Sequence, residues 1–152
     1  PEKLAVLSNG KPFSCDFDEI YDVFSSADLI VDHNVKFDIN FMIAEFCYQD
    51  RRFRYKQEFD TMKFFTNIMK LPRENHAGYK YPKLSELIGF LDIYPYDVTR
   101  KTAELFSVCG VGGHDARYDT AALYLAFNEG AKRSEELAKI KNKYLYPVGD
   151  DK

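Results

Sequence analysis

The sequence predicts a mixed α/β domain that lacks part of its β-sheet. Two short runs, at 29–31 and around 59, resemble strands, and they end at Asp32 and Asp60. The first is continuously apolar and β-branched, as in a buried strand of a parallel sheet. At least five other segments have apolar residues at helical spacing. Because a two-stranded sheet with a buried parallel pattern is not stable alone, we expect further strands, and the segment before Pro1 is their natural place.

The expected elements follow one another without internal repeats or low-complexity stretches. We predict one domain over 1–131, incomplete at its N-terminus, and a charged C-terminal helix and tail over 132–152. Within them the predicted order is a first helical turn at 1–5, a turn at 8–12, a helix at 18–24, a strand at 29–31, a helix at 37–46, a strand end near 59, a helix at 62–69, a loop at 72–82, a helix at 83–91, a turn at 94–96, one helical turn at 101–106, a helix through 121–127 and a charged, exposed helix from 131.

Charge and cysteine content restrict the class of protein. The formal net charge of −3 excludes a global basic footprint for nucleic acid, so polyanion contacts would need local patches or bound metal ions. The stretch 51–56 is one such patch, and is either a solvated loop or a phosphate-contacting, base-stacking edge. Cys15, Cys47 and Cys109 are read as reduced core thiols of an intracellular, cytoplasmic protein. No apolar run approaches the ~18 residues of a membrane-spanning helix.

Two segments carry the candidate chemistry. His33, Asn34 and Asp38 follow the first strand, where open α/β sheets place their sites, although His33-Asn34 alone would be read as a satisfied turn. In the second segment, 112–119, the glycines keep His114 in a loop, and Asp119 lies one turn inside the helix. Asp115 is the predicted N-cap. A carboxylate on an apolar helix face needs a partner or a metal ion, but an aspartate near a helix N-terminus is also favoured by the helix dipole.

These segments resemble two motifs of a known family. His33-Asn34-Val35-Lys36-Phe37-Asp38 is similar to the second motif, and His114-Asp115-Ala116-Arg117-Tyr118-Asp119 to the third motif, of the DEDDh 3′–5′ exonucleases. This family includes the proofreading epsilon subunit of bacterial replicative DNA polymerase and has a ribonuclease H-like fold. The resemblance covers about 1–131 and includes the residues at 41–42, 45–46, 60–61 and 84–87.

The resemblance implies a ribonuclease H-like fold and a two-metal site. Asp38 and Asp119 would be ligands of two divalent ions, Mg²⁺ or Mn²⁺, and are expected to converge at the carboxyl ends of parallel strands. His114 would be the general base, while His33, Asn34 and Phe37 would shape the floor under the terminal nucleotide. The implied substrate is a single-stranded 3′ end, and DNA is favoured over RNA as its chemical identity. A polymerase or another replication or repair protein is the implied protein partner, and no membrane is involved.

The sequence departs from the family at its first motif. No Asp-x-Glu ends an apolar strand before Leu29, and Asp16-Phe17-Asp18-Glu19 has the wrong context. We therefore expect this chain alone to hold no pair of metal ions and to have little exonuclease activity. A non-catalytic binding domain is the main alternative. A less favoured one is an HD-type metal phosphohydrolase, with His114-Asp115 and His33 or His76, but that family is all-helical.

Overall fold

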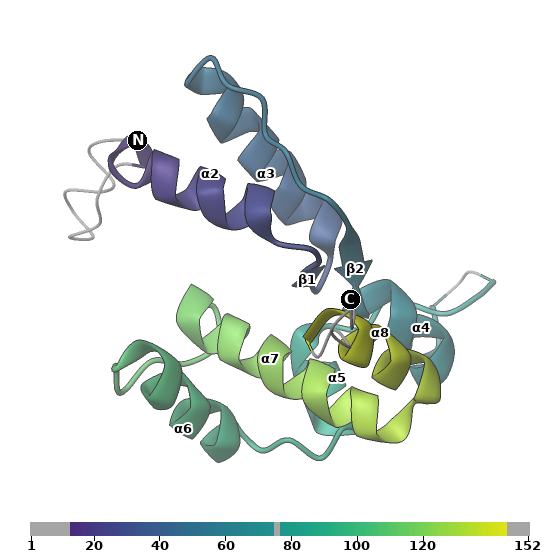
Figure 1. Ribbon diagram of the computed structural model, residues 1–152. Helices are drawn as coiled ribbons and strands as arrows, with labels where there is room; N and C mark the ends of the chain where they lie inside the picture. The colour runs from purple at the N-terminus through teal and green to yellow at the C-terminus, as the bar shows by residue number, and fades with distance from the viewer. Residues whose placement is uncertain (1–12, 75–76, 146–152) are drawn as a thin grey trace, which may run out of the picture. The chain divides into compact units, whose positions relative to one another are not determined.

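The computed structural model describes residues 13–74 and 77–145 and divides the chain into two compact units between Phe59 and Asp60 (Figure 1). The helical turn predicted at 1–5, the turn predicted at 8–12 and His76 lie outside the described residues.

The first unit is built around two helices that pack side by side (Figure 1). Val35, Ile39 and Phe46 recur at helical spacing on one face of the second helix and are all buried. The fully buried ring of Phe46 lies 4.4 Å from the Phe17 ring of the first helix and 5.1 Å from the ring of Phe53, measured between centroids. The elements of this unit are η1 (Phe13–Cys15), α2 (Phe17–Ser26), β1 (Ile30–Asp32), α3 (Val35–Tyr48) and β2 (Glu58–Asp60), whose last residue begins the second unit.

The two strands pair in parallel, as the sequence predicted. The Ile30 N–H donates a 2.9 Å hydrogen bond to the carbonyl oxygen of Gln57 just before β2. The strand residues are half-buried rather than fully buried. No other named strand occurs in residues 13–74 and 77–145. The structure therefore supports a mixed α/β chain that is mostly helical, and does not by itself support the ribonuclease H-like fold.

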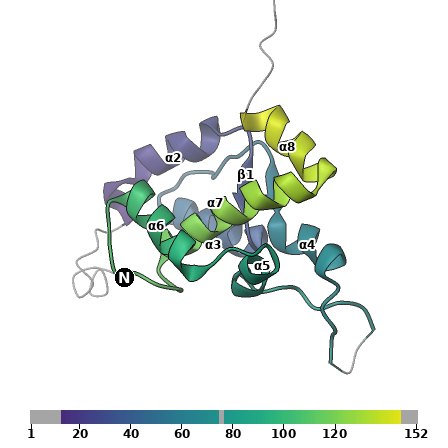
Figure 2. The same cartoon turned by 90° about the horizontal axis from the view of Figure 1, so that it is seen from below.

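The second unit is helical and is organised around its longest helix, α7 (Figure 2). This helix packs against α5, α6 and α8. Its buried face carries small residues, Ala122, Ala126 and Gly130, which allow neighbouring helices to approach closely. The elements are α4 (Thr61–Met69), α5 (Leu84–Phe90), α6 (Pro95–Phe106), α7 (Ala116–Arg133) and α8 (Glu135–Leu145).

Three predictions from the sequence were wrong. The turn predicted at 94–96 is the start of the 12-residue helix α6, with Pro95 in its first turn and the Asp97 carboxylate accepting a 3.2 Å hydrogen bond from the Tyr94 N–H. The helix predicted to be exposed does contain the 2.8 Å Lys139–Glu135 ion pair, but Leu137 within it is fully buried because α8 packs on α7. The cysteines are free, as expected, yet all of them are exposed rather than in the core: Cys15, Cys47 and Cys109.

Candidate functional site

The first candidate segment begins where β1 ends. The Asp32 carboxylate accepts a 2.6 Å hydrogen bond from the His33 N–H, and His33 is half-buried there. Asn34 then adopts a left-handed conformation, with φ 81°, at the N-cap position of α3. Asparagine tolerates this conformation better than most residues with a Cβ atom. The polar residues thus follow the strand, as the sequence indicated.

Helix α3 is attached to β2 through its first turn. The ammonium group of Lys36 lies 3.1 Å from Glu58 Oε1, and the Tyr55 hydroxyl donates a 2.9 Å hydrogen bond to Glu58 Oε2. The bond to Glu58 raises the pKa of both Lys36 and Tyr55. Next to this anchor Asp38 is exposed, and the Phe37 ring is 69% exposed. An exposed aromatic ring beside a carboxylate can stack on a base while the carboxylate binds a cation.

The second candidate segment leads from a turn into α7. The Asp115 N–H donates a 3.1 Å hydrogen bond to the Gly112 carbonyl, which closes a turn around the exposed His114. Asp115 is the N-cap of α7, as predicted, and its Oδ1 accepts a 2.9 Å hydrogen bond from the Arg117 N–H. The Arg117 side chain also donates to both carboxylate oxygens, from Nε to Oδ1 at 2.9 Å and from Nη2 to Oδ2 at 2.7 Å. The pKa of Asp115 is lowered to about 2, mainly by this side-chain bond.

Asp119 lies one turn inside α7, as the sequence predicted. Its N–H donates a 2.9 Å hydrogen bond to the Asp115 carbonyl oxygen, and its side chain is half-buried. Ala122 and Ala126 follow at helical spacing and are buried, so Asp119 borders the buried face of the helix. A carboxylate at such a border is stabilised by a hydrogen bond, an ion pair or a cation.

The two candidate segments belong to different units. His33, Asn34, Phe37 and Asp38 lie in the first unit, and His114 and Asp119 in the second. The structure describes each unit separately, so the convergence of Asp38 with Asp119 stays a prediction.

The described residues of neither unit alone fit the implied pair of divalent ions. In the described part of the chain, no group of three or more His, Cys, Asp or Glu side chains is arranged to hold a metal ion. Mg²⁺ binds through several oxygen ligands, and two such ions close together repel each other strongly. Asp38 and Asp119 supply one carboxylate from each unit, so a two-metal site would need further carboxylates.

The basic stretch 51–56 is mainly structural. The Arg51 guanidinium pairs with Asp18 at 2.8 Å and lies 5.2 Å from the centroid of the Phe17 ring. Phe53 is only 8% exposed, so its ring is not available for the base-stacking alternative. At the end of the stretch Lys56 pairs with Asp28 at 2.7 Å.

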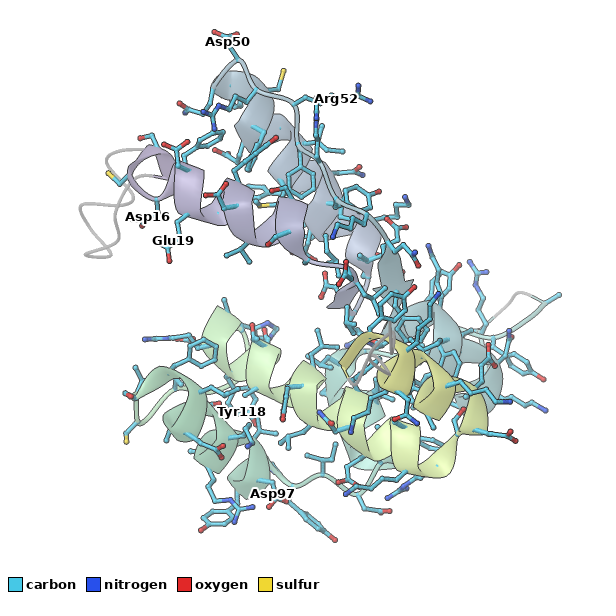
Figure 3. The ribbon with its side chains drawn as sticks, viewed as in Figure 1. Asp16, Glu19, Asp50, Arg52, Asp97 and Tyr118 are labelled. Carbon is cyan, nitrogen blue, oxygen red and sulfur yellow. The ribbon has the colours of Figure 1, made fainter. Side chains whose placement is uncertain are left out.

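Arg52 and Arg54 are the remaining cations of this stretch. Both are exposed and form no ion pair within the described residues. Figure 3 shows the Arg52 side chain extending away from α3. They line an open pocket of about 550 Å³. The charges around it are mixed, because it is lined by Asp18, Tyr21, Asp22, Asp50, Arg51, Arg52 and Arg54. None of the predicted site residues lines this pocket.

Sequence reasoning missed the structural role of Asp60. This residue ends β2 and caps α4, since its Oδ1 accepts a 3.2 Å hydrogen bond from the Lys63 N–H. Its Oδ2 lies 3.5 Å from the Lys63 ammonium group, and the side chain is 8% exposed. The order Asp, Thr and then an apolar helix is an N-cap signal that could have identified it.

None of the helices in residues 13–74 and 77–145 combines the length and the apolar composition needed to cross a bilayer. Comparisons of the chain with protein-family models, with curated proteins and with solved structures gave no match.

Proposed function

We propose that this chain is part of a metal-dependent 3′–5′ exonuclease domain that releases nucleotides from the 3′ end of a single strand, with DNA as the favoured substrate. The observation that carries the proposal is the local structure of the two motif segments. In the first, Asp38 lies in the first turn of a helix that follows a parallel strand. In the second, His114 lies in a turn, and Asp119 lies one helical turn later. The order of strand, helix and carboxylate in the first segment, and of turn, histidine and carboxylate in the second, supports the proposal.

The proposed reaction is hydrolysis of the terminal phosphodiester bond. The His114 imidazole accepts a proton from water, and the water oxygen forms a bond to phosphorus. The bond from phosphorus to the 3′ oxygen of the preceding nucleotide breaks, and this oxygen takes a proton from solvent to become the new 3′ hydroxyl. The exposure of His114 leaves its imidazole accessible to a water molecule and a substrate. Asp38 and Asp119 would act as ligands of Mg²⁺ or Mn²⁺, together with carboxylates that the described residues do not provide. The exposed Phe37 ring, with His33 and Asn34, would support the terminal base.

A non-catalytic nucleic-acid-binding role is the second candidate. It is favoured by the same observation that limits catalysis, namely that Asp38 and Asp119 are only two carboxylates and no group of metal ligands forms among the described residues. The parallel pair β1–β2 disfavours the HD-type phosphohydrolase, whose family is all-helical.

Cleavage and binding of a labelled single strand test the proposal. The 152-residue chain and a longer version carrying a strand-borne Asp-x-Glu would each be incubated with 3′-labelled single-stranded DNA and Mn²⁺. We expect both proteins to bind the strand and only the longer one to release nucleotides rapidly. In the longer protein, His114→Ala should lower the rate by roughly 10²–10⁴-fold and leave Mn²⁺ affinity unchanged, whereas Asp119→Asn should weaken Mn²⁺ binding.

The outcomes separate the candidates. Binding by the longer protein without any cleavage would support the non-catalytic role. Loss of Mn²⁺ binding in a folded His114→Ala protein would make His114 a metal ligand and refute its role as base. Rapid, His114-dependent cleavage by the 152-residue chain would refute the need for further carboxylates.

A further inference from the structure

The turn before α7 contains a conflict between residue type and backbone conformation. Its closing hydrogen bond joins Gly112 and Asp115, so Gly113 and His114 are its two central residues. His114 has φ 71°, whereas Gly113 is not among the glycines with positive φ. A turn with positive φ at its third residue favours glycine or asparagine there. The chain instead places glycine at the second position and histidine at the third, where the Cβ atom is unfavourable.

The residue after His114 is fixed by several contacts. Asp115 accepts hydrogen bonds from the Arg117 N–H and from two nitrogens of its guanidinium group. The two side-chain bonds form the bidentate arrangement that arginine makes with a carboxylate. The pKa of Asp115, about 2, shows that this carboxylate stays charged above strongly acidic pH. The turn is thus held at Gly112 on one side of His114 and at Asp115 on the other.

We propose that the Asp115–Arg117 pair is a clamp that holds His114 in its left-handed conformation, and that Arg117 is therefore a positioning residue for the imidazole. The clamp follows from the contacts alone. The role of the imidazole rests on the proposed function. The two parts therefore need separate measurements.

A double-mutant cycle on Tm tests the clamp. His114→Gly and His114→Ala would be compared with Arg117 present and with Arg117→Gln. Both substitutions at His114 remove the imidazole. The difference in Tm between the two variants therefore reports only how strongly the backbone conformation at this position favours glycine over alanine. With Arg117 present, the His114→Gly protein should melt roughly 4–8 °C above the His114→Ala protein. With Arg117→Gln, less than half of that difference should remain, because the released turn can relax.

Ser107 provides the matched control for the cycle. It is another residue of the same unit with positive φ, 54°, and it is the C-cap of α6. The difference in Tm between Ser107→Gly and Ser107→Ala should not respond to Arg117→Gln. The clamp would be overturned if the difference in Tm between His114→Gly and His114→Ala were equal with Arg117 and with Arg117→Gln. It would also be overturned if the two variants had the same Tm with Arg117 present.

The positioning role is tested by NMR of the His114 side chain. The Cε1–H signal, assigned with His114→Ala, would be titrated with 5′-dTMP in Mg²⁺. We expect dTMP to shift the Cε1–H signal in the native chain. Arg117→Gln should weaken dTMP binding roughly tenfold, as when a partner that orients a functional side chain is lost. Arg117→Lys should restore part of the dTMP affinity. An unchanged response after Arg117→Gln would refute the positioning role. No response in the native chain, with the Tm cycle as expected, would refute nucleotide binding beside His114 by this chain and leave the clamp standing.

Discussion

Gly130 lies where α7 packs closely against α4 and α8, and replacing it with alanine tests this packing. An added Cβ atom would lie 2.6 Å from Phe65 Cζ and 2.9 Å from Leu137 Cδ2. Non-bonded carbon atoms keep about 3.5–4.0 Å between them, so at least one side chain must move by roughly 1 Å. Phe65 is 2% exposed and Leu137 is fully buried, so neither side chain can move out into solvent without disturbing its packing.

Two effects of the Gly130→Ala substitution oppose each other. Alanine is favoured over glycine in a helix interior by about 1 kcal/mol, but Gly130 is close to the end of α7 at Arg133, where this gain is smaller. Adding a methyl group to a packed core costs about 1–3 kcal/mol. We therefore expect Gly130→Ala to lower the free energy of unfolding by about 1–2 kcal/mol.

Urea unfolding would measure this change, with Gly89→Ala as the control. Gly89 lies in α5, and an added Cβ there would meet nothing within 4 Å. Gly89→Ala should therefore raise the free energy of unfolding by up to about 1 kcal/mol. A Phe65→Leu background should reduce the cost of Gly130→Ala, because leucine lacks an atom at the Cζ position. The steric explanation fails if Gly130→Ala is as stable as Gly89→Ala, or if Phe65→Leu and Gly130→Ala are additive.

The contacts of α8 and of Asp115, and the exposure of Arg52 and Arg54, lead to three more expected outcomes. Leu137→Ala should lower the free energy of unfolding by about 2–5 kcal/mol in urea unfolding, whereas Lys139→Ala, at a surface ion pair, should change it by less than about 1 kcal/mol. The pKa of Asp115 is lowered from 3.8 to about 2, so its contribution to stability is complete above about pH 4 and is lost as the pH falls towards 2; Asp115→Asn should flatten an acid titration there. Joint replacement of Arg52 and Arg54 by Gln should reduce the slope of log K against log salt for single-stranded DNA by up to about 1.4, and an unchanged slope would exclude both arginines from phosphate contact.

Local sequence signals predicted most of the elements. The β-branched run before Asp32 identified β1, and the apolar spacing from Val35 to Phe46 is that of α3. Asp115 was predicted as an N-cap because it precedes an apolar helix directly after the glycine-marked turn, and it is the N-cap of α7. These signals succeed because strand periodicity, helix periodicity and capping are each determined by a few neighbouring residues.

Two kinds of feature could not be predicted in the same way. One kind has a local signal with two interpretations, and the other is determined by packing. The Tyr94-Pro95 step suits a turn or the first turn of a helix, and only the hydrogen bond from Tyr94 to Asp97 decides for the helix. The burial of Leu137 depends on a neighbouring helix rather than on the charged residues beside it. The convergence of the two motif segments depends likewise on contacts between residues far apart in sequence.

The conformation of His114 shows how a local rule can fail at a candidate site. Two adjacent glycines predict that a glycine takes any special backbone conformation in the turn, yet the positive φ belongs to His114. A glycine in place of His114 would fit this backbone better, so the imidazole is present in spite of local propensity. Such conflicts are concentrated at functional sites, where the surrounding structure holds them in place. Because Arg117 and Asp115 form contacts that can hold this turn, His114 is the residue at which the proposed function can be tested without first locating a metal ion.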